Sequence, residues 1–281
     1  MPSEARYPIR DVSLMTGVNP VTLRAWQRRY GLIKPARTES GHRLYSDDDI
    51  QRIQQILGWL ERGVSIGQVK SLLENPQPVV EGSSWDVLCH DLLETAQSLN
   101  SAKLETLLRD LAQLYPAELL LRHILEPWLQ SMNTLARPDR EIIEQSSRHV
   151  LMQVLLDITR IQNGPKVAVL SCGHCDILDS LLAQYELQSL ECRSLNLGAI
   201  NPAQLPLAAD RLKVDSYVII LGTGLAQAWF KQNTPYWPEH SYFIGEMGRI
   251  YADKGWLNLP YAANLNQLVK EHDTAFSLVQ K

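Results

Sequence analysis

The first thirty residues alternate apolar and polar positions with a helical period. Leu23, Trp26 and Tyr30 are spaced i, i+3 and i+7, so a helix from Asn19–Pro20 to Tyr30 would turn them toward a core. Gly31 follows as a stop, and a shorter helix over residues 9–15 ends at Gly17. Two short helices joined by a tight turn predict a helix-turn-helix.

The next forty residues change period twice. The segment "LIKPARTESGHRLY" is too short and too broken by proline and glycine for a helix, and it predicts a β-hairpin. Ser46 and Asp49 have the spacing of a capping box before a helix whose apolar positions include Ile53 and Leu60. Ser65 then starts another helix, and "NPQPVVEGSSW" has the composition of a linker.

Beyond the linker the pattern is helical from Trp85 to Ile161 and then alternates between strands and helices. Breaks near Asn100, Pro116 and Pro138 predict four helices in a bundle, with a kink at Pro127. After residue 164, "KVAVLSCG", "LECRSLNLG", "DSYVIILGTG" and "SYFIGEMG" are apolar runs bounded by glycine, with "WLNLP" as a later strand. Such a βαβ series predicts a parallel sheet covered by helices on both faces.

These patterns predict a multidomain chain. We expect an N-terminal winged helix-turn-helix over residues 1–75, a linker over 76–84, a helical bundle over 85–163 and an α/β parallel-sheet domain over 164–281. No apolar run is long enough for a transmembrane helix, and "MPSEARYPIR" lacks the apolar segment of a signal peptide. Four cysteines do not form a disulfide framework, so we expect a cytoplasmic protein.

Charge separates the first domain from the rest. The chain has a net charge of -4, yet residues 1–75 contain 11 Lys and Arg against 8 Asp and Glu, which leaves a net of -7 for the remainder. A basic domain on an acidic chain indicates a polyanionic partner. The predicted DNA-contacting residues come from the second helix and the wing: Thr22, Arg24, Arg28, Arg29, Tyr30, Lys34, Arg37, His42 and Arg43. We expect Thr22 and these arginines to point away from the core stripe.

The stretch "TLRAWQRRYGLIKPARTESGHRLYSDDDI", in its order of helix, wing and helix, resembles the DNA-binding domain of the MerR family of transcription regulators. The "RAWQRRYGL" and "GHRLY" versions resemble the CarH, LitR and MlrA branch, in which a bundle and a B12-binding-like, Rossmann- or flavodoxin-like domain follow. This resemblance implies a regulator that binds palindromic operator DNA as a dimer or tetramer. RNA polymerase is a further candidate partner, and no membrane is expected.

The segment "VLSCGHCDILDSLL" leaves three interpretations open. The B12-binding pattern would place a cobalt-ligating histidine at His174, but Cys172 and Ile177 replace its aspartate and glycine. Thr223 would line the nucleotide tail, and in the bundle Thr134 and Glu144–Gln145 replace the capping tryptophan and Glu-His pair. Losing such supporting groups weakens a metal ligand.

The second interpretation is a redox dithiol, because Cys172 and Cys175 have thioredoxin spacing and a helix N-terminus would lower the pKa of Cys172. Zinc is a weaker alternative, since three ligands within four residues cannot close a tetrahedron. The third is an empty site on a domain that senses another signal or contacts protein.

We expect no cofactor, with cobalamin as the alternative, and no enzyme. A cobalamin- or thiol-dependent sensor or enzyme with an accessory DNA-binding domain is the competing function.

Overall fold

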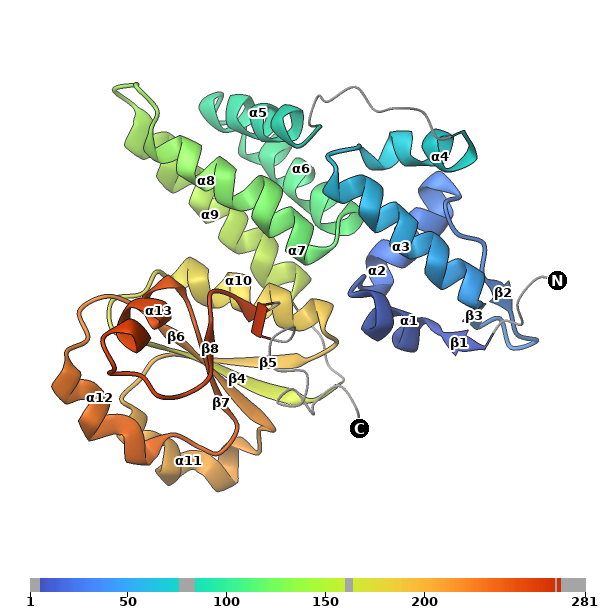
Figure 1. Cartoon of the computed structure of the whole chain (residues 1–281). Coiled ribbons are helices and arrows are strands. Elements are labelled where there is room, and N and C mark those ends of the chain that lie inside the picture. Colours follow the sequence, from blue (N-terminus) through green and yellow to red (C-terminus); the bar gives the residue numbers. More distant parts are fainter. Residues whose placement is uncertain (1–5, 76–83, 160–163, 266, 269–281) are drawn as a thin grey trace. The chain divides into compact units, whose positions relative to one another are not determined.

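The computed structural model describes residues 6–75, 84–159, 164–265 and 267–268, and the predicted linker lies almost entirely outside them. The chain forms two compact units, Met1–Val154 and Leu155–Lys281 (Figure 1). Among the described residues no helix is both long and apolar enough to span a membrane.

The first unit begins with the predicted helix-turn-helix. Helix α1 (Ile9–Thr16) ends at Gly17 in the left-handed conformation, and α2 (Pro20–Ala25) starts where the Asn19 side chain accepts the Thr22 N–H at 2.9 Å. The helix continues to Tyr30 as a wider π-turn, η1 (Trp26–Tyr30), and stops at Gly31, whose φ is 61°. We call Pro20–Tyr30 the recognition helix. The predicted bounds are correct, although the change of turn was not foreseen.

The wing is a three-stranded antiparallel sheet. Strands β2 (Ala36–Arg37) and β3 (Arg43–Tyr45) form the predicted hairpin, and β1 (Tyr7–Pro8) pairs with β3 on its other side, giving the order β1-β3-β2. Two residues that include a proline show no period, which is why β1 was not predicted.

Two helices complete this domain. Helix α3 (Asp47–Glu61) starts at the predicted capping box, in which Ser46 Oγ accepts the Asp49 N–H at 3.2 Å and Asp49 accepts the Ser46 N–H at 3.0 Å. Helix α4 (Ile66–Glu74) follows. The buried side of α3 includes Ile53, Ile56 and Leu60, and these side chains form part of the core.

The helical segment has the predicted breaks. It consists of α5 (Ser84–Gln97), α6 (Ser101–Leu114), a continuous stretch made of α7 (Ala117–Leu120), η2 (Leu121–Leu125) and α8 (Glu126–Asn133), and α9 (Arg140–Ile158). The irregularity expected at Pro127 is the π-turn η2 directly before it. Proline removes an N–H and crowds the carbonyl four residues earlier, so a wide turn at this point lets the helix continue.

The second unit is an open parallel sheet with the order β5-β4-β6-β7-β8, which confirms the predicted fold class. Its strands are β4 (Lys166–Cys172), β5 (Arg193–Ala199), β6 (Ser216–Leu221), β7 (Ser241–Ile244) and β8 (Tyr261–Ala262). The connecting helices are α10 (Ile177–Ser189), η3 (Pro202–Gln204), α11 (Leu205–Leu212), α12 (Gln227–Asn233), η4 (Thr234–Tyr236) and α13 (Glu246–Asp253).

Helices cover both faces of this sheet. Ala183 and Leu187 of α10 pack on one face, while residues of α11, α12 and α13 such as Phe230 and Tyr251 pack on the other. The strand expected at "WLNLP" is wrong: Leu257 is buried in the second layer, and pairing with β7 begins only where Pro260 accepts the Phe243 N–H at 3.1 Å.

Candidate nucleic-acid interface and C-terminal site

The recognition helix presents basic side chains on the side away from its core stripe. Leu23 and Trp26 are fully buried, whereas Arg28 and Arg29 are exposed and Arg24 is half-buried. Tyr30 is also half-buried. The expectation that Thr22 points outward is wrong in this structure, because its side chain is 0% exposed and its hydroxyl has no hydrogen-bond partner among the described residues.

The wing supplies the other predicted basic residues. Lys34, Arg37 and His42 are exposed, and the turn between the strands is closed by Thr38, which bonds His42 through both its backbone and its hydroxyl. Arg43 is half-buried, and its Nε donates to Gln27 Oε1 of the recognition helix at 2.6 Å. Gln27 was not singled out in the sequence, and it ties the wing to the helix.

Tyr45 is influenced by charges from both the recognition helix and the wing. Burial raises the pKa of its hydroxyl, and the positive charges of Arg43 and Arg24 oppose that shift. Arg24 belongs to the recognition helix and Arg43 to the wing, so both guanidinium groups lie near the same phenol. The fold thus gathers basic groups from two elements onto one surface.

This arrangement has the dimensions and chemistry of a duplex-binding surface. A helix with side chains is about 10–12 Å wide, which matches the major groove of B-DNA at about 12 Å. Arginines on its outer side can bond guanine edges, and wing cations can contact the phosphate backbone.

One predicted DNA-contacting residue has partners within the protein. Arg29 Nη1 lies 3.2 Å from Asp110 Oδ1, and its Nη2 donates to Gln113 Oε1 at 3.3 Å; both acceptors belong to α6. Trp26 Nε1 donates to the carbonyl of Leu114 at 2.8 Å. These partners are over 80 residues away in sequence, and no local pattern indicates them.

At the carboxyl edge of the parallel sheet, the loops after β4 and β6 are closed on each other. The His174 N–H donates to Thr223 O at 2.9 Å and the Thr223 N–H returns to His174 O at 3.2 Å. A Cβ on Gly222 would lie 2.2 Å from His174 O, and a Cβ on Gly173 would lie 2.6 Å from Thr223 O. Only glycine allows backbones to approach this closely.

The residues of this edge do not fit cobalamin. The His174 ring lies against Gly224, where a Cβ would be 2.8 Å from its Cδ2. Cys172 occupies the expected acid's position but is a buried thiol, and Ile177 is 64% exposed at the start of α10. Two backbone hydrogen bonds between His174 and Thr223 hold the loops together, and the His174 ring has no carboxylate partner within the described chain. Thr223 takes part in the closure.

The dithiol interpretation also meets a physical obstacle. Burial raises the pKa of Cys172 to about 12, and burial raises the pKa of Cys175 as well. The expected helix-dipole effect is wrong because Cys172 ends β4, and α10 begins only at Ile177 after its cap Asp176. Thiols that hold their protons are poor nucleophiles.

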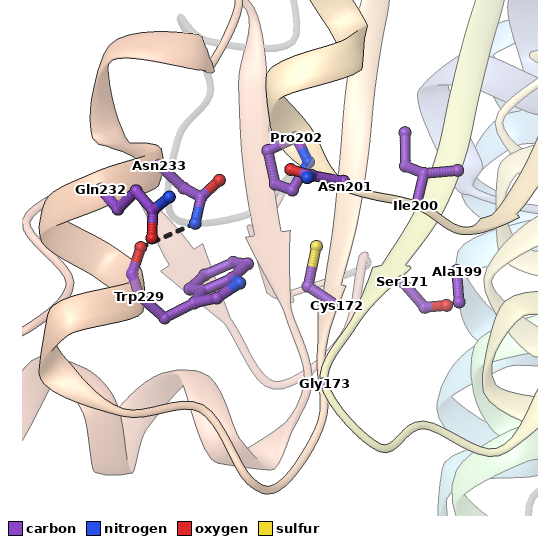
Figure 2. Close-up of a pocket in the computed structure, with 10 residues that line it drawn as sticks. All are labelled: Ser171, Cys172, Gly173, Ala199, Ile200, Asn201, Pro202, Trp229, Gln232 and Asn233. Carbon is purple, nitrogen blue, oxygen red and sulfur yellow. Dashed lines mark hydrogen bonds between the residues drawn. The ribbon is translucent and has the colours of Figure 1, made fainter.

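A hollow lies beside the hydrogen-bonded loops that follow β4 and β6. It is at the ends of β4 and β5 and against α12 (Figure 2). Its volume is about 330 Å³, and its wall includes the Trp229 indole, the Cys172 thiol and the carboxamides of Asn201, Gln232 and Asn233. Asn233 Nδ2 donates to the Trp229 carbonyl at 2.8 Å, and Asn201 Oδ1 accepts the Ala203 N–H at 3.1 Å. No charged side chain lines it among the residues that the structure describes, so its chemistry suits small uncharged molecules.

Metal binding has little support. Within the described residues, the side chains near enough to share an ion are His90, Asp91 and Glu94, three exposed positions on one side of α5. The ligand atoms of Cys172, His174 and Cys175 do not gather in this way. The zinc interpretation of the "CGHC" segment therefore has no geometric basis in the described chain.

The fold and the basic surface define a winged helix-turn-helix domain joined to a helical segment and an α/β domain. Residues 7–76 match the MerR HTH family regulatory protein family. The N-terminal domain is therefore of the MerR type, which confirms the resemblance seen in the sequence.

Relatives extend this similarity beyond the first domain. The chain is 46% identical over 123 residues to the HTH-type transcriptional regulator MlrA of Escherichia coli K12, covering 44% of this chain and 50% of MlrA. It is 29% identical over 200 residues to the HTH-type transcriptional repressor CarA of Myxococcus xanthus, covering 69% of each. It is 26% identical over 171 residues to the repressor CarH of the same organism, covering 54% of this chain and 57% of CarH. The matched region thus spans about half the length of MlrA.

Proposed function

We propose that this protein is a DNA-binding transcription regulator whose N-terminal domain inserts its recognition helix into the major groove. The observation that supports this most is the surface formed by Arg24, Arg28 and the wing cations in a domain of the MerR type. An acidic chain that concentrates its positive charge on one such domain has the electrostatic pattern of a nucleic-acid-binding protein.

The operator is proposed to be palindromic and bound by two copies. One helix of eleven residues contacts too few base pairs for specificity, and paired half-sites mirror a twofold protein dimer. Helix α4 ends at Glu74 after only nine residues, so it offers no long dimerisation helix directly after the wing domain. We therefore assign at least part of the dimer contact to the helical segment or the α/β domain.

The α/β domain is proposed to descend from a cobalamin-binding module and to have lost that ligand. It keeps the parallel sheet and the histidine, but its loops are closed by the His174–Thr223 bridge. Its role would be to sense another signal or to contact protein. The alternative, an enzyme with an accessory DNA-binding domain, lacks support because Cys172 and Cys175 have raised pKa values and the described residues that line the hollow in Figure 2 include no charged group for acid–base chemistry.

Selection of duplexes from a random-sequence library with the full-length chain tests this function. We expect recovered sequences that share an inverted repeat and bind two chains per duplex. Recovery of sequences without twofold symmetry, bound by one chain, would contradict the dimeric operator. Failure to enrich any duplex would contradict DNA-binding regulation itself.

A further inference from the structure

The recognition helix is covered along one flank by α6. Trp26 donates a hydrogen bond to the Leu114 carbonyl, Arg29 donates to Asp110 and Gln113, and α2 also contacts α6. Ala25, on the same flank, is only 5% exposed. We call this set of interactions the α6 contact.

The α6 contact overlaps the surface that DNA would need. Arg28 on the outward side and Arg29 on the α6 side are consecutive residues of the recognition helix. A notch of about 280 Å³ lies where the two sides meet, lined by Val21, Ala25, Arg28, Arg29 and Gln113. DNA approaching Arg28 would therefore meet α6.

The widths of the helix pair and of the major groove show that α6 and DNA cannot both contact the recognition helix. Packed helices have axes about 8–10 Å apart, so a helix pair is roughly 20 Å wide, whereas the major groove is about 12 Å wide. The recognition helix can enter the groove alone but not with α6 on its flank. The phosphates that border the groove would also lie where the Asp110 carboxylate now holds Arg29.

We propose that α6 is an autoinhibitory cover of the recognition helix, with Asp110 and Gln113 occupying guanidinium donors of Arg29 that DNA phosphates take over. The proposal rests on the proposed DNA-binding function and adds its regulation. Arg29 and Asp110 side chains are 48% and 50% exposed, and such exposed ion pairs are weak and exchangeable. Phosphates can thus displace the carboxylate.

A second set of contacts also joins the winged helix-turn-helix domain to the helical segment. It uses no residue that would face DNA. Glu61 at the end of α3 pairs with Arg122 of η2 and lies 3.6 Å from His123 Nε2, and His123 stacks on Trp85 with ring centroids 5.2 Å apart. These groups are on α3, η2 and α5, not on the recognition helix. Opening therefore requires the loss of both the α6 contact and these Glu61 contacts.

The test compares two matched full-length variants, Asp110→Arg and Asp91→Arg. Both replace a helical aspartate with arginine, but Asp91 is exposed on α5 and has no part in the α6 contact, whereas Asp110 is half-buried on α6. Fluorescence anisotropy with a random-sequence duplex of about 30 base pairs at about 50 mM salt measures phosphate-driven binding without a known operator. We expect Asp110→Arg to raise affinity at least about tenfold over wild type and Asp91→Arg no more than about threefold, since only the former repels Arg29.

Equal affinities for the two variants would overturn the proposal while leaving DNA binding intact. No binding by wild type or either variant would instead count against the proposed function, and with it the cover. Should Asp110→Arg fail to fold by circular dichroism, Gln113→Ala removes one Arg29 acceptor more gently, and it should still raise affinity. A second readout is hydrogen exchange of wild type: amides of residues 101–114 should lose protection when the duplex is added, and unchanged protection would also overturn the cover.

Discussion

At the scale of single residues, exposure separates the basic groups by role. Arg28 projects freely from the recognition helix, whereas Arg29 is held by α6 and Arg43 by Gln27. The sequence correctly placed these arginines on one domain, because charge counts are local properties of the chain. It could not indicate which arginine is already paired, because Asp110 and Gln113 are brought to Arg29 only by tertiary packing.

Arg28→Ala should weaken binding to the selected operator by about 1–3 kcal/mol if the guanidinium bonds a base edge. The matched variant Arg211→Ala removes the same charge from an exposed position on α11 and should change affinity less than about twofold. Anisotropy titrations measure both. If the two variants bind alike, Arg28 makes no specific contact.

The thiols of the "CGHC" segment should be unreactive in the native protein. Burial raises the pKa of Cys172 to about 12, well above pH 8, so this thiol keeps its proton. Iodoacetamide at that pH should leave Cys172 unmodified in mass spectra, while the urea-unfolded chain is alkylated. Native Cys172 labelling as fast as in urea would revive the redox interpretation.

At the scale of elements, local stop and start signals predicted most boundaries. Asn19–Pro20, Gly31 and the Ser46–Asp49 pair act within one helical turn, so the residues themselves specify these ends. The π-turn Trp26–Tyr30 and the two-residue strand β1 were missed. The apolar period of Trp26 and Tyr30 does not distinguish a π-turn from an α-helix, and β1 is too short to show a period and pairs with the distant β3.

The two asparagine caps provide a matched pair of variants. Asn19→Ala removes the acceptor of the Thr22 N–H, and Asn100→Ala removes that of the Lys103 N–H at 3.0 Å. Each should lower the free energy of unfolding by about 1 kcal/mol in urea titrations. Only Asn19→Ala should also weaken DNA binding, because that cap fixes the start of the recognition helix. If Asn19→Ala and Asn100→Ala bind DNA equally well, the start of the helix does not depend on the Asn19 cap.

At the scale of the whole molecule, a domain of the MerR type is joined to a helical segment and to an α/β domain with an open parallel sheet. The βαβ order was predictable because buried strands bounded by glycine are local features. The closure of the site was not, because the His174–Thr223 bridge joins loops about fifty residues apart.

Cobalamin should therefore leave this protein unchanged. Absorption spectra of the protein mixed with cobalamins and then desalted should show no retained corrin, and DNA affinity should be the same in light, in darkness and with added cobalamin. His174→Ala should behave as His240→Ala, a change at another exposed histidine. A stoichiometric complex whose spectrum changes only in His174→Ala would make His174 a cobalt ligand.

We expect the basic surface of the recognition helix and wing to bind DNA through its phosphates. The affinity of the full-length chain for the selected duplex, measured across a salt series, tests this expectation. Each phosphate contact releases counterions, so the logarithm of the association constant should fall linearly as the logarithm of salt rises, with a slope of about -0.9 per contact. An affinity that stays constant from low to high salt would contradict the account.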